Sequence, residues 1–260
     1  MNIGERDELV FKIAMIRLRD TQRYVFGEKV VSVGFGGFEY RALPEDFNMG
    51  IIPEMSDSEL EAFTGKLGIS KAATGAKSDI YINNVGISLK SLRAAPAALV
   101  NHTARPGFEF ACKNSNSSID FLDEAVERYW AFRLRGIISE DTKTIDEFCP
   151  FKPYKNELKP VIEYFLFKGS GSKLSQYPAS YIIEFTDPLK PSTYELLTPG
   201  DAFKSVWKKL VFSMRAKKGM PSNYDKNTYR GKNAESIAKW VEYIDGDYRG
   251  ALHIRCRKKN

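Results

Sequence analysis

Residues 78–91 constrain the fold more strongly than any other part of this sequence. Asn83 and Asn84 stand between two runs in which apolar residues alternate with other types. Asparagine tolerates the positive φ angles of a two-residue turn, so the segment is predicted to form a β-hairpin. Counting outward from the turn places Asp79 opposite Ser88.

One face of this hairpin carries polar groups. Because side chains alternate between faces, Asp79, Ser88 and Lys90 share one side. The other side can point to a core and carries Ile80, Ile82, Ile87 and Leu89. Opposed Cβ atoms lie about 5 Å apart, so Asp79 and Ser88 can line one ion. Mg²⁺ takes one or two carboxylates with waters and phosphate, and a nearby lysine can orient its bound water. The face therefore fits a Mg²⁺-dependent phosphodiesterase site that lacks one carboxylate, or else an ordinary solvated surface.

The missing carboxylate has to come from elsewhere in the chain. Residues 4–19 are predicted to form a helix, in which Glu5 and Glu8 flank the apolar stripe that includes Leu9. That position favours Glu8 and, after it, Glu5, although acids in a first turn also complement the helix dipole. Glu109 is the third candidate, and an ordinary surface position is the simpler interpretation for it.

The order Asp79, Ser88, Lys90 resembles the PD-(D/E)xK nuclease motif in its serine-substituted form, found in some type II restriction endonucleases. Residues 4–9 are similar to the glutamate-bearing helix that many of these enzymes place beside the active site. Residues 86–101 resemble the strand, loop and helix that follow in that group. Where the motif has proline, this sequence has Ser78.

The resemblance implies an α/β (α+β) fold with a restriction-endonuclease-like mixed central β-sheet flanked by helices. Asp79 and Glu8, or Glu5, would bind Mg²⁺, and Lys90 would position the attacking water. The implied activity is that of a sequence-specific endonuclease of a restriction–modification system, which cuts double-stranded DNA to 5′-phosphate and 3′-hydroxyl ends. The alternatives are a non-catalytic nucleic-acid-binding protein and a nuclease for branched or single-stranded DNA. A homodimer follows only by analogy with palindromic targets.

Charge is distributed unevenly along the chain. Residues 198–260 contain 15 Lys and Arg against 6 Asp and Glu, a net of +9, whereas all 260 residues sum to +6. This excess favours a polyanion partner such as DNA, with a solvated lysine-rich surface as the alternative. The prolines at 150, 153 and 160 indicate a linker. Together with the uneven charge, this linker predicts a catalytic core over residues 1–148 and a basic DNA-recognition region over residues 149–260. The two regions could share the same fold.

The expected DNA contacts are polar or basic residues in both regions. They are Arg93, Asn101, His102, Arg105, Arg215, Lys217, Lys218, Lys226, Arg230 and Lys232. A structural histidine is the alternative for His102. Tyr224 and Tyr229 stand among the lysines and could stack on bases.

Hydrophobic periodicity predicts the remaining elements. Helices are expected over residues 56–67, 94–103, 120–135 and 236–244. Residues 30–40 are expected to form a strand or a hairpin, and strands are expected over residues 161–167, 180–185 and 252–257. Residues 202–212 can be helical or extended.

Several classes of protein are excluded or disfavoured. No apolar run reaches about 18 residues, so no membrane helix is expected, and no secretory signal is recognisable at the start. The three cysteines, Cys112, Cys149 and Cys256, are far apart, which suits a reducing cytoplasm and a cytoplasmic protein. Two histidines are too few for a poly-histidine metal site.

Overall fold

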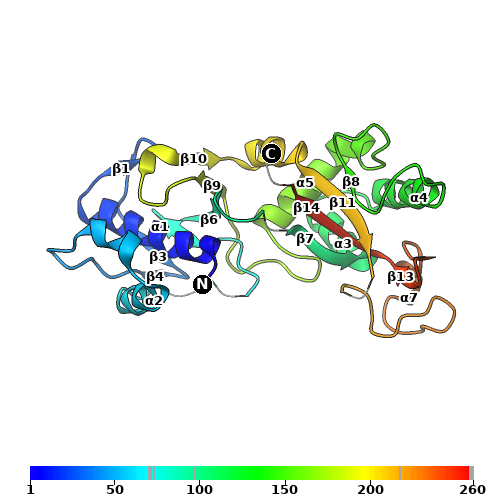
Figure 1. Cartoon of the computed structure of the whole chain (residues 1–260), viewed down its shortest axis with the longest axis horizontal. Coiled ribbons are helices and arrows are strands. Elements are labelled where there is room, and N and C mark those ends of the chain that lie inside the picture. The colour runs from blue at the N-terminus through cyan, green and yellow to red at the C-terminus, as the bar shows by residue number, and fades with distance from the viewer. Residues whose placement is uncertain (70–71, 73, 97, 217, 258–260) are drawn as a thin grey trace. The chain divides into compact units, whose positions relative to one another are not determined.

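The computed structural model describes residues 1–69, 72, 74–96, 98–216 and 218–257, and it divides the chain into two compact units. Unit 1 comprises Met1–Ala95 and Ser175–Pro199, and unit 2 comprises Pro96–Leu174 and Gly200–Asn260. Both units combine helices with sheet, which confirms the mixed α and β class (Figure 1). The boundary expected between residues 148 and 149 falls inside unit 2. The functions assigned to those two regions stay predictions.

A six-stranded mixed sheet forms the centre of unit 1, in the order β10-β9-β6-β5-β3-β4. Its strands are β3 (Val33–Phe35), β4 (Phe38–Glu39), β5 (Ile80–Ile82), β6 (Val85–Ser91), β9 (Tyr181–Phe185) and β10 (Tyr194–Leu197). Strands β6 and β9 are parallel, and the other pairs of this sheet are antiparallel. A parallel pair needs a long connection, and here the intervening chain builds much of unit 2. A small hairpin, β1 (Tyr24–Val25) with β2 (Glu28–Lys29), completes the strands described in unit 1.

Two capped helices belong to unit 1. Helix α1 (Ile3–Asp20) begins with a capping box between Asn2 and Glu5 and packs against β6 and β3 (Figure 1). Helix α2 (Asp57–Lys66) begins with the capping pattern predicted from the sequence, at Ser56 and Glu59. The helices predicted over residues 4–19 and 56–67 are thus confirmed. Short 3₁₀ turns lie at η1 (Met49–Glu54) and η3 (Pro191–Thr193).

Unit 2 contains a four-stranded antiparallel sheet in the order β7-β14-β11-β8. Its strands are β7 (Ala98–Ala104), β8 (Thr142–Lys143), β11 (Leu210–Arg215) and β14 (Ala251–Cys256), and a separate hairpin joins β12 (Glu242–Ile244) to β13 (Asp247–Arg249). Its helical elements are α3 (Arg105–Asn114), α4 (Asp120–Leu134), η2 (Lys152–Tyr154), α5 (Lys155–Phe167), α6 (Pro199–Trp207) and α7 (Ala234–Ala238). The helix predicted over residues 120–135 and the strand over 252–257 are confirmed.

Three predictions of secondary structure were wrong. Residues 94–103 do not form a helix, because β7 pairs with β14 along this stretch. Residues 161–167 belong to α5 and not to a strand; Leu158, Val161, Ile162 and Phe165 are buried at helical spacing, with Pro160 inside the helix rather than in a linker. The helix expected over residues 236–244 ends at Ala238, after which the chain becomes β12.

In the described part of the chain, no helix is both long and apolar enough to cross a membrane.

Candidate functional site

The hairpin predicted for residues 78–91 is present at the centre of the unit 1 sheet. Asn83 and Asn84 form its turn with φ angles of 51° and 64°, and Ile80 pairs with Ile87 as counted from the sequence. The four apolar side chains predicted to face the core are all buried: Ile80, Ile82, Ile87 and Leu89. The same alternation therefore leaves the polar side chains on the opposite face.

Asp79 is held in place by the strand opposite it. Its backbone N–H donates to the Ile87 carbonyl at 2.8 Å. Its Oδ2 accepts hydrogen bonds from the Ser88 hydroxyl at 3.1 Å and from the Leu89 backbone N–H at 2.7 Å. Ser88 is only 3% exposed. The Ser88 hydroxyl thus orients the Asp79 carboxylate.

Glu8 lies on α1, the helix packed against β6. Its Oε1 is 2.7 Å from Nζ of Lys12, a lysine whose side chain is fully buried. The Glu5 carboxylate instead accepts a hydrogen bond at 3.1 Å from the backbone N–H of Asn2, as part of the capping box. Of the two glutamates predicted on this helix, Glu5 thus caps the helix start, and Glu8 is the one that pairs with a core lysine.

Tyr40, which sequence reasoning missed, is a buried tyrosine of unit 1. It is only 4% exposed, and burial raises the pKa of its hydroxyl well above the ordinary value. The negative charges of Glu8 and Asp79 raise this pKa further. Among the described residues, the Tyr40 hydroxyl has no hydrogen-bond partner. The helix acid and the hairpin acid predicted from the sequence thus both belong to unit 1, Glu8 on α1 and Asp79 directly before β5.

Two lysines lie beside Asp79. The predicted one, Lys90, is exposed at the end of β6. Lys77 was not predicted: burial lowers its pKa to about 8, the like charge of Lys90 lowers it as well, and Asp79 acts in the opposite direction. Strand alternation could have indicated Lys77, because it is two residues before Asp79 and falls on the same face. A lysine with a pKa near 8 can exchange a proton close to neutral pH.

A buried ion pair fastens α1 to β6 next to these groups. Asp7 is 1% exposed and accepts hydrogen bonds from the Ser91 hydroxyl and the Arg93 guanidinium. The second contact from Arg93, Nε to Oδ2 of Asp7, measures 3.1 Å. Arg93, expected to contact DNA, thus has a structural partner, although its side chain is half exposed.

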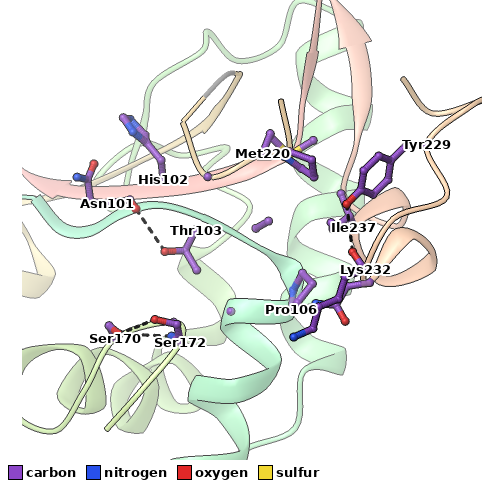
Figure 2. A pocket seen from close by; sticks show the side chains of 16 residues that line it. Asn101, His102, Thr103, Pro106, Ser170, Ser172, Met220, Tyr229, Lys232 and Ile237 are labelled. Atoms are coloured by element: carbon purple, nitrogen blue, oxygen red, sulfur yellow. Dashed lines mark hydrogen bonds between the residues drawn. The ribbon is translucent and has the colours of Figure 1, made fainter. Parts of the chain in front are cut away.

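In unit 2, a cavity of about 600 Å³ collects several of the expected DNA contacts. Figure 2 shows Asn101, His102 and Lys232 among its lining residues, together with Ser170 and Ser172 from the loop after α5. None of the sixteen lining residues is Asp or Glu. The lining therefore presents hydroxyl, amide and ammonium groups without a competing carboxylate, which suits an anionic ligand.

The remaining expected contacts differ in their surroundings. Exposed cationic side chains are found at Lys218, Lys226 and Arg230. Arg215 forms ion pairs with Glu140 and Asp141. Lys217 lies outside the described residues.

Arg105 is almost completely buried. It pairs with Asp123 and with Glu109, whose other oxygen accepts a hydrogen bond from Ser236 at 2.8 Å. Glu109 thus stabilises unit 2, whereas Asp79 belongs to unit 1. We therefore leave Arg105 and Glu109 out of the proposed binding and metal sites.

His102 packs against His253 on the neighbouring strand, with ring centroids 4.5 Å apart. Burial lowers the pKa of both imidazoles, and the charge of Arg215 lowers both further. Each Nδ1 atom is buried without a partner among the described residues. These contacts agree with the structural alternative for His102.

A tyrosine cluster accompanies the exposed lysines of unit 2. Tyr224 lies 5.2 Å from Tyr229 and 5.6 Å from Tyr248, whose ring is 5.0 Å from Tyr243, as measured between centroids. The sequence predicted an aromatic role for Tyr224 and Tyr229, but only the β12–β13 hairpin brings the other two to them. Aromatic rings next to cations are typical of surfaces that bind nucleic-acid strands.

No group of three His, Cys, Asp or Glu side chains gathers into a ready metal site within the described residues. A cation near Asp79 would be held by two carboxylates, with the rest of its ligands from water or substrate. Searches against protein-family models, curated proteins and solved structures found no match to this chain. The function is therefore inferred from the chemistry of these residues.

Proposed function

We propose that this protein is a Mg²⁺-dependent endonuclease that cuts double-stranded DNA at specific sequences, as restriction enzymes do. One observation carries the proposal: the Asp79 carboxylate of the central hairpin is fixed by the Ser88 hydroxyl and the Leu89 backbone N–H, while α1, which carries Glu8, packs against strand β6 of the same hairpin. The charges of Lys90 and Asp79 both act on Lys77, a second lysine of this region. Two acids with adjacent cations form the donor set that phosphodiester hydrolysis requires.

The donor set fits Mg²⁺. Glu8 and Asp79 supply hard carboxylate oxygens, and this ion is commonly held by one or two carboxylates while it keeps several waters. When bound, Mg²⁺ makes a coordinated water more acidic and offsets negative charge on phosphate. Around it, the chain's own residues do the positioning: Ser88 and the Leu89 backbone N–H fix Asp79, and Lys12 fixes Glu8.

The lysines have separate roles in the proposed reaction. Lys90, which is exposed, would hold the attacking water and the phosphate by charge. Lys77, with a pKa of about 8, is protonated in part of the molecules at neutral pH and can take up or release a proton. Because Lys90 lowers the pKa of Lys77, loss of Lys90 would raise that pKa.

Charge and fold support DNA as the substrate. Unit 2 carries the acid-free cavity, the exposed Lys218, Lys226 and Arg230, and the tyrosine cluster. The mixed sheet of unit 1, with α1 packed against its hairpin strand, supports a restriction-endonuclease-like version of the α/β class. Phosphate contacts by the lysines would position the DNA, and cavity residues such as Asn101 would contact base edges.

The test is cleavage of long unmethylated DNAs with Mg²⁺, with Mn²⁺ and with EDTA. We expect discrete bands in the presence of metal only, and ends with 5′-phosphate and 3′-hydroxyl when fragments are mapped on a sequenced plasmid. Lys90→Ala should abolish the bands while leaving DNA affinity within a few-fold of the unmodified protein. Degradation without discrete bands would indicate a non-specific nuclease, and cleavage only of branched or single-stranded DNA would replace the proposed substrate.

A DNA-binding protein without catalysis is the second candidate. It is favoured by the Glu8–Lys12 ion pair, which gives Glu8 a structural reason to be present. This candidate predicts salt-dependent DNA binding without cleavage in any metal, and without an effect of Lys90→Ala.

A further inference from the structure

Strand β9 extends the polar face of the hairpin beyond β6. The two strands are parallel, and their register pairs Ser88 with Ile182 and Lys90 with Glu184. Directly paired residues on neighbouring strands point to the same face of a sheet. Glu184 therefore lies beside Lys90 on one face, and alternation along β6 places Ser88 and its partner Asp79 on that face as well.

The residues one position earlier on both strands agree with this orientation. Leu89 and Ile183 are partners in the same register, and both are buried in the hydrophobic cluster that includes Leu9 of α1. Because successive side chains of a strand point to opposite faces, Lys90 and Glu184 point away from that cluster. Their exposure fits this placement, since Glu184 is half-buried and Lys90 is exposed.

The folded chain does not use the charge of either side chain. Lys90 and Glu184 are partners of opposite charge, yet within the described residues they form no ion pair with each other or with any other group. The Glu184 carboxylate also accepts no hydrogen bond from these residues. Glu8, in contrast, already pairs with the buried Lys12. Glu184 can therefore bind a ligand without breaking a contact of the fold.

The spacing of the sheet fits one hydrated cation between Asp79 and Glu184. Strands β5 and β9 flank β6, so Glu184 is two strands and two residues away from Asp79. With strands about 4.8 Å apart and a rise of about 3.3 Å per residue, the two Cα atoms lie about 12 Å apart, with Lys90 between them. Mg²⁺ keeps several of its waters, so an ion bound to Asp79 can reach Glu184 through one of them.

We propose that Glu184 accepts a hydrogen bond from a water of the cation held at Asp79, and so supplies a second carboxylate on this face of the sheet. The inference rests on the proposed cation site at Asp79, but it does not require Glu8 as a ligand. Glu184 is then a positioning residue that holds water beside the Lys90 ammonium. Loss of such an outer group typically weakens metal binding by about 10–100-fold.

The experiment measures Mn²⁺ binding to the full chain without DNA, by electron paramagnetic resonance and calorimetry. We expect Glu184→Gln to raise the Mn²⁺ dissociation constant about tenfold. Glu195→Gln is the matched control, because Glu195 pairs with Glu184 on the same face but lies one strand further from Asp79 and is exposed. This control should leave the dissociation constant almost unchanged, since water and salt screen an exposed charge. Without metal, the Tm of Glu184→Gln should not fall below that of Glu195→Gln.

The outcomes separate the inference from the proposed function. If the unmodified protein binds Mn²⁺, Asp79→Asn abolishes binding, and Glu184→Gln binds as tightly as the unmodified protein, the role of Glu184 is refuted while the metal site stands. Equal weakening by Glu184→Gln and Glu195→Gln also refutes it, because total charge rather than position would then set the affinity. Weaker binding by Glu184→Gln together with a loss of Tm refutes it as well, because the carboxylate would then be structural. If the unmodified protein does not bind Mn²⁺, the proposed metal site itself fails, and the inference fails with it.

Discussion

The ion pair between Glu8 and Lys12 gives the most informative stability prediction, because both interpretations of Glu8 depend on it. The Lys12 side chain is 0% exposed and the Glu8 side chain 29% exposed, with 2.7 Å between Nζ and Oε1. Glu8→Gln leaves the ammonium group buried without a counter-charge, a change that costs about 3–5 kcal/mol of the free energy of unfolding. Lys12→Met leaves an acid that can still reach water, so its expected cost is about 1–3 kcal/mol.

The double variant distinguishes the interaction energy of the ion pair from the separate contributions of Glu8 and Lys12 to stability. Replacing both charged groups removes the uncompensated ammonium, so Glu8→Gln with Lys12→Met should lie within about 1 kcal/mol of the unmodified protein. The two changes then couple by at least about 2 kcal/mol, well above the additivity error for independent sites. An exposed pair serves as control: Asp201 lies 3.1 Å from Lys204, and Asp201→Asn should cost no more than about 0.5 kcal/mol.

Urea unfolding followed by circular dichroism measures these values. Fluorescence is unsuitable, because Trp130, Trp207 and Trp240 all belong to unit 2 while the ion pair is in unit 1. The reasoning is refuted if Glu8→Gln lowers the free energy of unfolding by less than Lys12→Met does. It is also refuted if the losses of the two single variants sum to that of the double variant, because the buried ammonium of Lys12 would then not depend on Glu8. If the folded double variant also fails to bind Mn²⁺ while Lys12→Met binds it, Glu8 is a metal ligand in addition to a structural partner.

Three further predictions test other parts of the molecule. Gly86→Ala should reduce the free energy of unfolding by about 1–3 kcal/mol, because its Cβ would lie 2.4 Å from Ser78 Oγ and 2.6 Å from the Pro178 carbonyl; an unchanged Tm would contradict this. The lowered pKa values of His102 and His253 mean that the unfolded chain binds more protons below its pKa of about 6.5. Stability should therefore fall as the pH decreases from 7.5 to 5, and His253→Phe should flatten that slope; an equal slope in both proteins would contradict this. DNA affinity should decrease steeply with salt, and Lys226→Ala should reduce the slope by about one phosphate contact, whereas a flat response would remove the proposed contacts.

The parts of the site that were predictable from the sequence depend on local rules. The Asn83 and Asn84 turn sets the hairpin register, and with it the position of Asp79 relative to Ser88. Helical periodicity likewise indicated that Glu8 faces inward from the first helix. Turn chemistry, alternation and helical spacing all operate within a few residues, so one sequence is sufficient to apply them.

The parts that were missed depend on contacts between distant segments. Strand β6 pairs in parallel with β9, across a stretch of chain that builds much of unit 2, and no local pattern indicates this pairing. The same holds for Tyr40, which enters the core of unit 1 from the chain after β4. In α5, Pro160 hid a helical pattern that its buried neighbours make clear in the structure.

The neighbours Asp7 and Glu8 make separate contacts that fix the orientation of α1. Consecutive helical residues point about 100° apart, so Asp7 can bond to Ser91 and Arg93 while Glu8 points to Lys12. The first contact fixes the helix against the strand that carries Lys90, and the second pairs Glu8 with the buried Lys12. If α1 were rotated by one residue, Glu8 would take the position of Asp7. The buried Asp7 carboxylate would then lose its ion pair with Arg93. The fold therefore specifies the rotation of α1 through the turn that carries Asp7 and Glu8.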